Sequence, residues 1–138
     1  MESKRQIIVS YDDHERLANL LTSKFASAFS DKPYLQELRR EISLAEIVSA
    51  ADIPPNVVTM NSTVRLYDLL DQEEETYTLV YPDEANIAEG KLSVFAPIGT
   101  AIIGTQVGDM IRWNIPHGLL QLKVTELIFQ PERDGVMA

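Results

Sequence analysis

Side chains that could do chemistry are few in this sequence. Its 138 residues contain no cysteine and two histidines, His14 and His117. These histidines fall in different expected elements, and neither has a carboxylate at ligand spacing, so the pattern does not favour a metal site. Three adjacent acids, Glu73 to Glu75, could attract a cation, but neighbouring charges in a turn are typical of a solvated surface. We expect no metal and no cofactor.

No nucleophile stands where an enzyme would need one. The sequence lacks a cysteine thiol, a Gly-x-Ser-x-Gly elbow and a Ser-x-x-Lys pair, and its glycines 99, 104 and 108 do not form a phosphate loop. Gly99 and Gly104 are instead expected to allow close backbone approach and to end a helix. We therefore predict a protein that acts by binding and is not an enzyme.

The charge distribution favours a basic protein surface as the partner. The formal net charge is -9, and it is uneven: residues 1–50 carry 7 basic and 8 acidic side chains, whereas residues 51–138 carry 5 and 13. Nucleic acids are held largely through Lys and Arg on their phosphates, so no direct sequence-specific binding of DNA or RNA is expected. An acidic domain is better matched to a basic protein.

Length and composition indicate one small domain with an appendage. The 45% of apolar residues can form a real core, but no apolar run approaches the roughly 20 residues that span a bilayer. The first residues lack the pattern of a secretory signal, and the absence of cysteine means that nothing needs an oxidising compartment. We expect a cytoplasmic protein without a membrane partner.

Two helices are expected in the N-terminal part. The first spans 12–29, where Asp12 and Glu15 have the spacing of a capping pair and apolar residues recur along one face. The second begins after Ser30-Asp31-Lys32-Pro33, with Asp31 or Lys32 as the cap and Pro33 in the first turn. The seam residues are Leu17, Leu20, Leu21, Phe25 and Ala28 in the first helix and Leu35, Leu38, Ile42, Ala45 and Ser49 in the second.

The short connection makes these helices an antiparallel hairpin, a short coiled coil. With about 18 residues per helix, the hairpin would be about 27 Å long, and it would need a second domain as a base. Before it, residues 6–10 could be a strand or an extended arm. Because Pro54-Pro55 cannot continue a helix, we place the helical hairpin at 1–52 and the second domain at 53–138.

The second domain is expected to be rich in strands, at 57–60, 63–69, 76–81, 92–95, 110–114 and 119–129. An acidic turn at 71–75 and a hairpin turn at Pro116-His117-Gly118 connect strands, and a short helix lies at 100–103. An antiparallel or mixed sheet curled around this helix is the economical arrangement, which makes the fold α+β. Residues 132–138 are expected to be a loose tail.

A resemblance to a known family lies in this second domain. From Ser93 to Asp109 the sequence reads S-x-x-x-P-x-G-x-A-x-x-G-x-x-x-G-D, which resembles the signature of the transcription elongation factors GreA and GreB. That family's C-terminal domain has a fold like the FKBP prolyl isomerases. The stretches DIPPNVVTMNS at 52–62 and TLVYP at 78–82 resemble its Rnk branch, named as regulator of nucleoside diphosphate kinase. A family name is not a mechanism.

The resemblance implies a function, which we state as an expectation. A Gre-type regulator would bind RNA polymerase at the rim of the secondary channel and compete with the cleavage factors of the family. The expected partner-binding residues are Ser93, Phe95, Ala96, Pro97, Ile98 and Gly99. The protein is expected to act as a monomer.

The hairpin tip argues against stimulation of transcript cleavage. The family's cleavage factors carry acidic side chains there, which help to hold a catalytic metal in the polymerase active centre. This chain has Asp31 with Lys32 beside it, and Tyr34 stands where those factors have a second acid. One carboxylate supplies only part of a metal's oxygen shell. The predicted hairpin is also shorter than theirs.

Two alternative functions remain open from the sequence. FKBP-type folds can be prolyl isomerases, which need aromatic side chains that converge on a proline ring. The aromatic candidates are Tyr67, Tyr77, Tyr81, Phe95, Trp113 and Phe129. The branch name suggests direct binding to nucleoside diphosphate kinase, for which the residues provide no argument in either direction.

Overall fold

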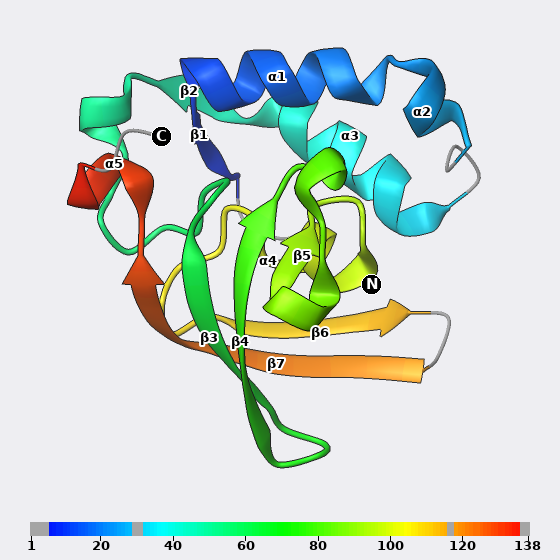
Figure 1. The fold of residues 1–138 in the computed structure, drawn as a ribbon, viewed down its shortest axis with the longest axis vertical. Coiled ribbons are helices and arrows are strands. Elements are labelled where there is room, and N and C mark those ends of the chain that lie inside the picture. Colours follow the sequence, from blue (N-terminus) through cyan, green and yellow to red (C-terminus); the bar gives the residue numbers. More distant parts are fainter. Residues whose placement is uncertain (1–5, 29–31, 116–117, 136–138) are drawn as a thin grey trace.

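The chain folds as two packed N-terminal helices against a mixed β-sheet (Figure 1). The structure is a computed structural model that describes residues 6–28, 32–115 and 118–135. The α+β class predicted from the sequence is confirmed. None of the helices in these ranges has the length and apolar character needed to span a bilayer.

The elements follow one another in the order in which Figure 1 labels them. The N-terminal part contains β1 (Ile8–Ser10), α1 (Tyr11–Leu21), α2 (Lys24–Ser27), α3 (Pro33–Leu44), β2 (Glu46–Val48) and the 3-10 turn η1 (Ala50–Asp52). The remainder contains β3 (Thr63–Asp68), β4 (Glu73–Val80), the 3-10 turns η2 (Pro82–Glu84) and η3 (Ile87–Glu89), β5 (Lys91–Ser93), α4 (Pro97–Ile102), β6 (Met110–Ile115), β7 (Gly118–Phe129) and α5 (Pro131–Asp134).

The first helix begins earlier than expected. Ser10 is the N-cap of α1, and its Oγ accepts a hydrogen bond from Asp13 N at 3.1 Å. Asp12 lies in the first turn, where a carboxylate still interacts favourably with the helix dipole. The predicted cap at Asp12 is therefore wrong, because the Ser10 hydroxyl already satisfies the free amide of the first turn.

The helix predicted over 12–29 is also divided. α1 ends at Leu21 and the single turn α2 begins at Lys24. The hydroxyls of Thr22 and Ser23 donate to backbone carbonyls three residues earlier, at 2.9 and 2.6 Å, and Ser23 Oγ accepts from Ala26 N at 3.3 Å. Hydroxyl side chains that bond the backbone compete with the helix, which explains the break.

The second helix confirms the placement of Pro33 in its first turn, after Lys32 as the N-cap. It ends at Leu44, short of the predicted Ser49, because residues 46–48 pair in parallel with 8–10 and Glu46 N donates to Ile7 O at 2.9 Å. The N-terminal segment is thus a strand and not a free arm. α3 has 12 residues and is about 18 Å long. The predicted length of about 27 Å was too great.

The main sheet has the strand order β5-β4-β3-β7-β6. β4 and β5 run parallel, and the other neighbours are antiparallel. Val64 pairs with Tyr77 and faces the core, while Arg65 faces outward and forms ion pairs with Glu126 and, at 3.6 Å, with Glu74. The sheet is therefore apolar on the face that meets the helices.

Three of the predicted strands differ from those observed, and one of them, expected at 92–95, is β5 and ends at Ser93. Residues 57–60 are buried but form only an isolated bridge, between Val57 and Gln106, instead of a strand. β4 begins at Glu73, so three of the five residues of the expected acidic turn belong to the strand, and Glu74 and Glu75 make specific contacts there. The pairing of residues 63–68 with 73–78 drives this extension.

Two further expectations are corrected at the helical segments of this domain. α4 begins at Pro97 instead of Thr100, because proline fits the first turn of a helix, where no N–H is needed. Residues 131–134 form α5 and are not a loose tail. Thr59 Oγ1 donates to Glu132 Oε1 at 2.8 Å and ties this helix to the segment before β3.

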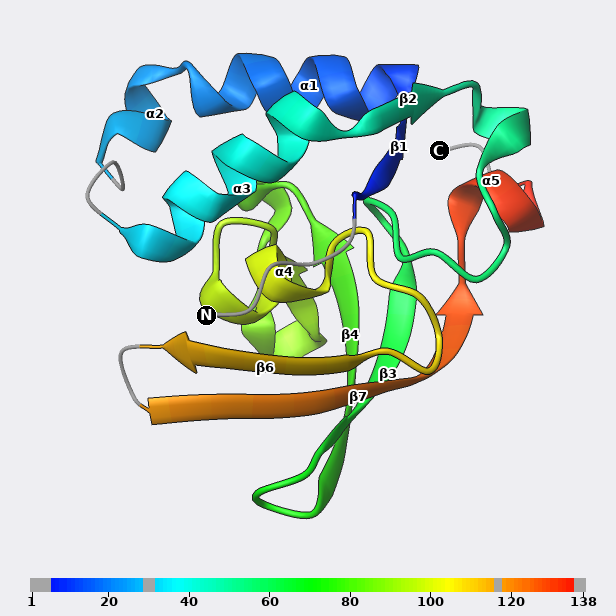
Figure 2. The same ribbon diagram turned by 180° about the vertical axis from the view of Figure 1, so that it is seen from behind.

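One continuous core joins the helices to the sheet. Leu17, Leu35 and Leu38 are fully buried in the same cluster as residues of every strand of the main sheet. Burial of one such side chain contributes about 1.5–3 kcal/mol. α3 also packs on α4, and Figure 2 shows α4 between α3 and β6. The helices are therefore held to the sheet by apolar burial.

Gly99 is required by a close backbone contact. A Cβ at this position would lie 2.0 Å from Ser93 O, and a backbone oxygen in a packed turn cannot move aside. Gly104 has φ +77 and follows the end of α4, and a Cβ there would meet Ile7. The predicted roles of both glycines, in close approach and in helix termination, are confirmed.

Replacement of Gly99 should therefore be strongly destabilising. We expect Gly99→Ala to lower the free energy of unfolding by about 3 kcal/mol, the upper part of the range for overpacking. Gly108→Ala is the control, because open space surrounds Gly108 and only its φ of +98 opposes a side chain; that strain costs about 1–2 kcal/mol. Urea unfolding of the two variants measures the difference, and equal losses would contradict the close contact at Gly99.

Candidate functional site

The predicted partner-binding residues lie at an edge of the sheet where two strands end together. β4 and β5 run parallel with Val80 opposite Ser93. Val94 N donates to Val80 O at 2.9 Å, so the pairing continues past the strand ends. Parallel strands end at the same edge, and the segments that follow, residues 81–84 and 94–97, leave the sheet side by side.

Local hydrogen bonds shape the turn from β5 into α4. Ser93 Oγ accepts from Phe95 N at 2.9 Å, and Ser93 O accepts from Ala96 N at 3.0 Å. Thr100 Oγ1 donates to Val94 O at 2.8 Å from within α4. The expected apolar loop tip is thus a tight turn that enters the helix at Pro97, which makes the backbone of this segment rigid.

The six predicted contact residues differ in exposure. Phe95 is 3% exposed and belongs to the core, and Gly99 is buried. Ala96 and Ile98 are partly exposed and pack against the core, while Pro97 and Ser93 are partly exposed beside them. Phe95 and Gly99 therefore support the backbone of this edge from inside. The exposed surface is formed by Ser93, Ala96, Pro97 and Ile98.

The hairpin tip is only partly described. Asp31 lies outside the described residues, and Lys32 is exposed at the N-cap of α3, without a side-chain cap hydrogen bond. Tyr34 is partly buried and packs against the core. Tyr34 lies in the first turn of α3 and contributes to packing there.

Among the described residues, no group of three or more His, Cys, Asp or Glu side chains is placed to hold a metal ion. His14 is partly buried on α1, and His117 lies outside the described residues. Glu75 Oε2 accepts from Tyr77 OH at 2.6 Å, and Glu74 pairs with Arg65 at 3.6 Å. These two acids thus have partners within the sheet.

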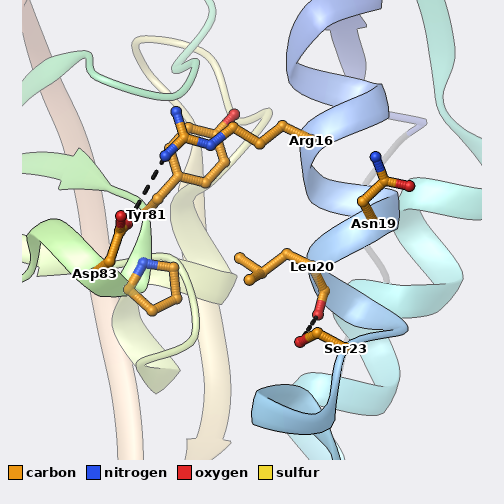
Figure 3. Close-up of a pocket in the computed structure, with 7 residues that line it drawn as sticks. Arg16, Asn19, Leu20, Ser23, Tyr81 and Asp83 are labelled. Atoms are coloured by element: carbon orange, nitrogen blue, oxygen red, sulfur yellow. Dashed lines mark hydrogen bonds and ion pairs between the residues drawn. The ribbon is translucent and has the colours of Figure 1, made fainter.

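A groove opens beside this edge, between α1 and the segment that follows β4 (Figure 3). We call it the α1 groove; it has a volume of about 540 Å³. Its walls are largely apolar, and it is open to solvent on one side. Leu20 points from α1 toward the segment of Tyr81 and Asp83, as Figure 3 shows. The lining residues are Arg16, Asn19, Leu20, Ser23, Tyr81, Pro82 and Asp83.

Arg16 closes one end of the α1 groove. Its guanidinium carbon lies 3.7 Å from the centroid of the Tyr81 ring, and its Nη2 lies 3.8 Å from Asp83 Oδ1. A cation over an aromatic face is worth about 0.5–1 kcal/mol at an exposed site. The side chains of Arg16 and Asp83 are 53% and 75% exposed, so their ion pair is weak and its main effect is to orient Arg16.

Tyr81 connects the groove to a carboxylate at the joint between the helices and the sheet. Its hydroxyl donates to Asp13 Oδ1 at 3.0 Å. Burial raises the pKa of Asp13 to about 6, against the opposing effect of the Tyr81 hydrogen bond, and Glu132 and Asp12 raise it further. Burial and the nearby Asp13 charge raise the pKa of Tyr81 well above its ordinary value. One carboxyl group thus bonds α1 to the end of β4.

Sequence reasoning missed the α1 groove. Leu20 was assigned to the helical seam, Tyr81 was named only as an aromatic candidate, and Arg16, Asp13 and Asp83 were not singled out. The stretch TLVYP at 78–82, which contains the lining residues Tyr81 and Pro82, is the one part of the sequence pattern that points to this groove. The groove depends on the contact between α1 and residues 81–83, which are 60 or more positions apart in the chain.

Comparisons with known proteins agree with this architecture. The family described as "Transcription elongation factor, GreA/GreB, C-term" matches residues 53–128, and "Rnk N-terminus" matches residues 5–48. A helical hairpin on a mixed five-stranded sheet is thus the arrangement of a GreA/GreB-type factor. The chain belongs to the Rnk family, which combines the Rnk N-terminus with the GreA/GreB C-terminal domain.

Individual relatives support the same assignment. The chain is 40% identical over 134 residues to "Regulator of nucleoside diphosphate kinase" of Escherichia coli strain K12, which covers 96% of each chain. It is 34% identical over 96 residues to "Transcription elongation factor GreA" of Pelobacter propionicus, which covers 70% of this chain and 61% of that one. A solved structure, "Prokaryotic transcription elongation factor GreA/GreB from Nitrosomonas europaea", has 38% identity and a TM-score of 0.74 over 91% of this chain and all of that one.

The raised pKa of Asp13 predicts a specific pH dependence of stability. Because the folded pKa of about 6 exceeds the usual value of 3.8, the folded state binds this proton more tightly. The stabilisation is complete below pH 3.8 and is lost as the pH rises through 6. Two pKa units correspond to about 3 kcal/mol.

Asp13→Asn keeps an oxygen for the Tyr81 hydroxyl but removes the charge. We expect this variant to be more stable than wild type at pH 7, by at most about 3 kcal/mol, and the gap to close by pH 4. Asp71→Asn, an exposed change in the β3–β4 turn, should follow wild type throughout. Urea unfolding at several pH values tests this, and a gap that is constant with pH would exclude Asp13 as the group responsible.

Proposed function

We propose that this protein is an RNA polymerase-binding transcription regulator that docks at the rim of the secondary channel. It competes there with cleavage factors and does not stimulate transcript cleavage. The observation that carries this proposal is the match to GreA/GreB and Rnk sequences in order along the chain, which includes the Ser93–Asp109 signature. Membership in the family makes polymerase the first partner to test.

The docking contact proposed is the exposed part of the edge formed by Ser93, Ala96, Pro97 and Ile98. The turn is rigid, which lowers the entropy lost on binding. The domain that carries it is acidic, with 5 basic and 13 acidic side chains in residues 51–138. The excess of negative charge on this domain favours association with a basic protein surface.

The short hairpin supports a role without cleavage. α3, the second arm, has 12 residues, so it rises only about 18 Å. The hairpin also lies against the sheet and shares its core, so it does not project freely. The tip carries at most one carboxylate, Asp31, with Lys32 next to it. A factor of this shape would occupy the rim of the channel without delivering metal ligands to the active centre.

The structure gives prolyl isomerase activity no comparable support. Among the described side chains, the α1 groove contains one aromatic ring, that of Tyr81, and Arg16 already covers its face. Tyr67 and Tyr77 fall on opposite faces of the sheet, by the register of β3 and β4. These rings do not converge on one point, as a proline-binding pocket would require.

Polymerase binding should depend on the edge that carries Pro97. We expect purified bacterial core RNA polymerase to retain the wild-type protein in a pull-down, and Pro97→Ala combined with Ile98→Asp to reduce retention at least tenfold. A charge at Ile98 removes apolar contact at a side chain that is partly exposed and partly packed against the core. Thermal unfolding checks that the double variant is folded. Equal retention of a folded double variant and wild type would refute the assignment of this edge.

Transcript cleavage tests the second half of the proposal. In stalled elongation complexes with magnesium, we expect no acceleration of cleavage by the wild-type protein, and slower cleavage when it is added together with a GreA factor. Asp31→Asn should behave in the same way, since the tip has no metal-directed role. Stimulation by wild type that Asp31→Asn abolishes at equal polymerase binding would show that the tip does take part in the chemistry.

A further inference from the structure

We propose that the α1 groove is a second contact of the docking interface, and that it accepts an apolar side chain flanked by basic residues on the partner. This inference rests on the proposed function and adds to it a site formed jointly by the helices and the sheet. The sequence resemblance pointed only to residues 93–99.

The form of the groove suits an apolar side chain. Its volume of about 540 Å³ lies within the range of roughly 300–1,000 Å³ found for ligand pockets. The walls are mainly Leu20, Pro82 and the Tyr81–Arg16 stack, and the lining surface is far more apolar than polar. A concave, mainly apolar surface with a few polar groups is typical of binding sites.

The position of the groove is continuous with the proposed docking edge. Tyr81 and Pro82 follow β4 directly, and Val94 and Phe95 follow β5 beside them. The groove and the Pro97 edge therefore both adjoin one pair of strand ends. The proposal assigns both to one partner surface for this reason.

The charges around the groove favour a basic partner over a second copy of this chain. Asp83 is exposed at one wall, Glu84 is exposed directly after it, and Asp12 and Glu15 are exposed on α1. Arg16 is the one cation among the lining residues, and Asp83 already pairs with it. A second copy would bring another net charge of -9 to this face, which like-charge repulsion opposes.

The groove is pre-formed by contacts across the joint. Tyr81 is 2% exposed and its hydroxyl is held by Asp13 of α1, so the ring cannot swing into the groove. Arg16 is held over the ring from the α1 side. One wall comes from α1 of the hairpin and the other from residues 81–83, which follow β4. A partner in the groove would therefore bind only when the hairpin and the sheet are packed as they are here.

The test fills the groove without disturbing the core. Asn19 is exposed and lines the groove, so Asn19→Trp should occupy it. Asn114→Trp is the matched control, because Asn114 is exposed on β6, at the opposite edge of the sheet from β5. Binding of purified bacterial core RNA polymerase is measured by biolayer interferometry, with thermal unfolding as the check on folding. We expect Asn19→Trp to weaken binding at least tenfold and Asn114→Trp to change it less than twofold.

Two charge-reversal variants test whether the partner has basic residues beside the groove. Glu84→Lys, next to the lining residue Asp83, should weaken binding and reduce its dependence on salt, because one attractive charge is lost and a repulsive one is added. Glu73→Lys makes the same change at the start of β4, the end far from Tyr81, and should have a smaller effect. Equal effects of the two charge reversals at the same salt concentration would overturn the inference that the partner is basic beside the groove.

The outcomes separate this inference from the proposed function. Wild type that fails to bind polymerase overturns the proposed function and the groove assignment with it. Polymerase binding that is lost in the Pro97→Ala and Ile98→Asp double variant but unchanged in a folded Asn19→Trp variant leaves the proposed function standing and overturns the groove. Loss in Asn19→Trp with normal binding of Asn114→Trp supports the groove as a contact.

Discussion

Apolar burial between the helical hairpin and the sheet is the constraint from which the rest of the structure follows. α1 and α3 have 11 and 12 residues, and isolated helices shorter than about 12–15 residues are marginal in water. Leu17, Leu35 and Leu38 are fully buried against residues of the sheet. The hairpin therefore depends on the sheet for its stability, and the joint between them has to be well defined.

The parallel pairing of β4 with β5 places the candidate site. It brings residues 81–84 and 94–97 to one edge, and α1 crosses beside this edge because its apolar face is buried there. The Asp13–Tyr81 hydrogen bond and the Arg16–Tyr81 stack then set the width of the α1 groove. Desolvation of the Asp13 carboxyl group, which raises its pKa to about 6, carries a cost at neutral pH.

Much of this fold could be predicted from the sequence, and the errors have physical causes. Helical spacing of leucines and the alternation of strand residues located the hairpin and five strands of the main sheet. The end of α3 could not be predicted, because residues 46–48 form a strand only when residues 8–10 lie beside them. The break at Thr22 and Ser23 depended on hydroxyl bonds that compete with the helix. The α1 groove was missed because it needs a tertiary contact between α1 and Tyr81.

The same pairing of β1 with β2 connects the fold to the proposed mode of action. The sequence pattern predicts that α3 continues through residues 46–48. These residues form a strand instead, because their backbone pairs with that of Ile8, Val9 and Ser10. The strand pair ends the second arm of the hairpin at Leu44 and turns the chain toward the sheet. Extension of α3 past Leu44 would require this pair to separate, and the buried Ile7 and Val9 are part of the same packing. The packing of the base thus fixes where the second arm ends, and under the proposed function a short second arm would keep this protein at the channel rim.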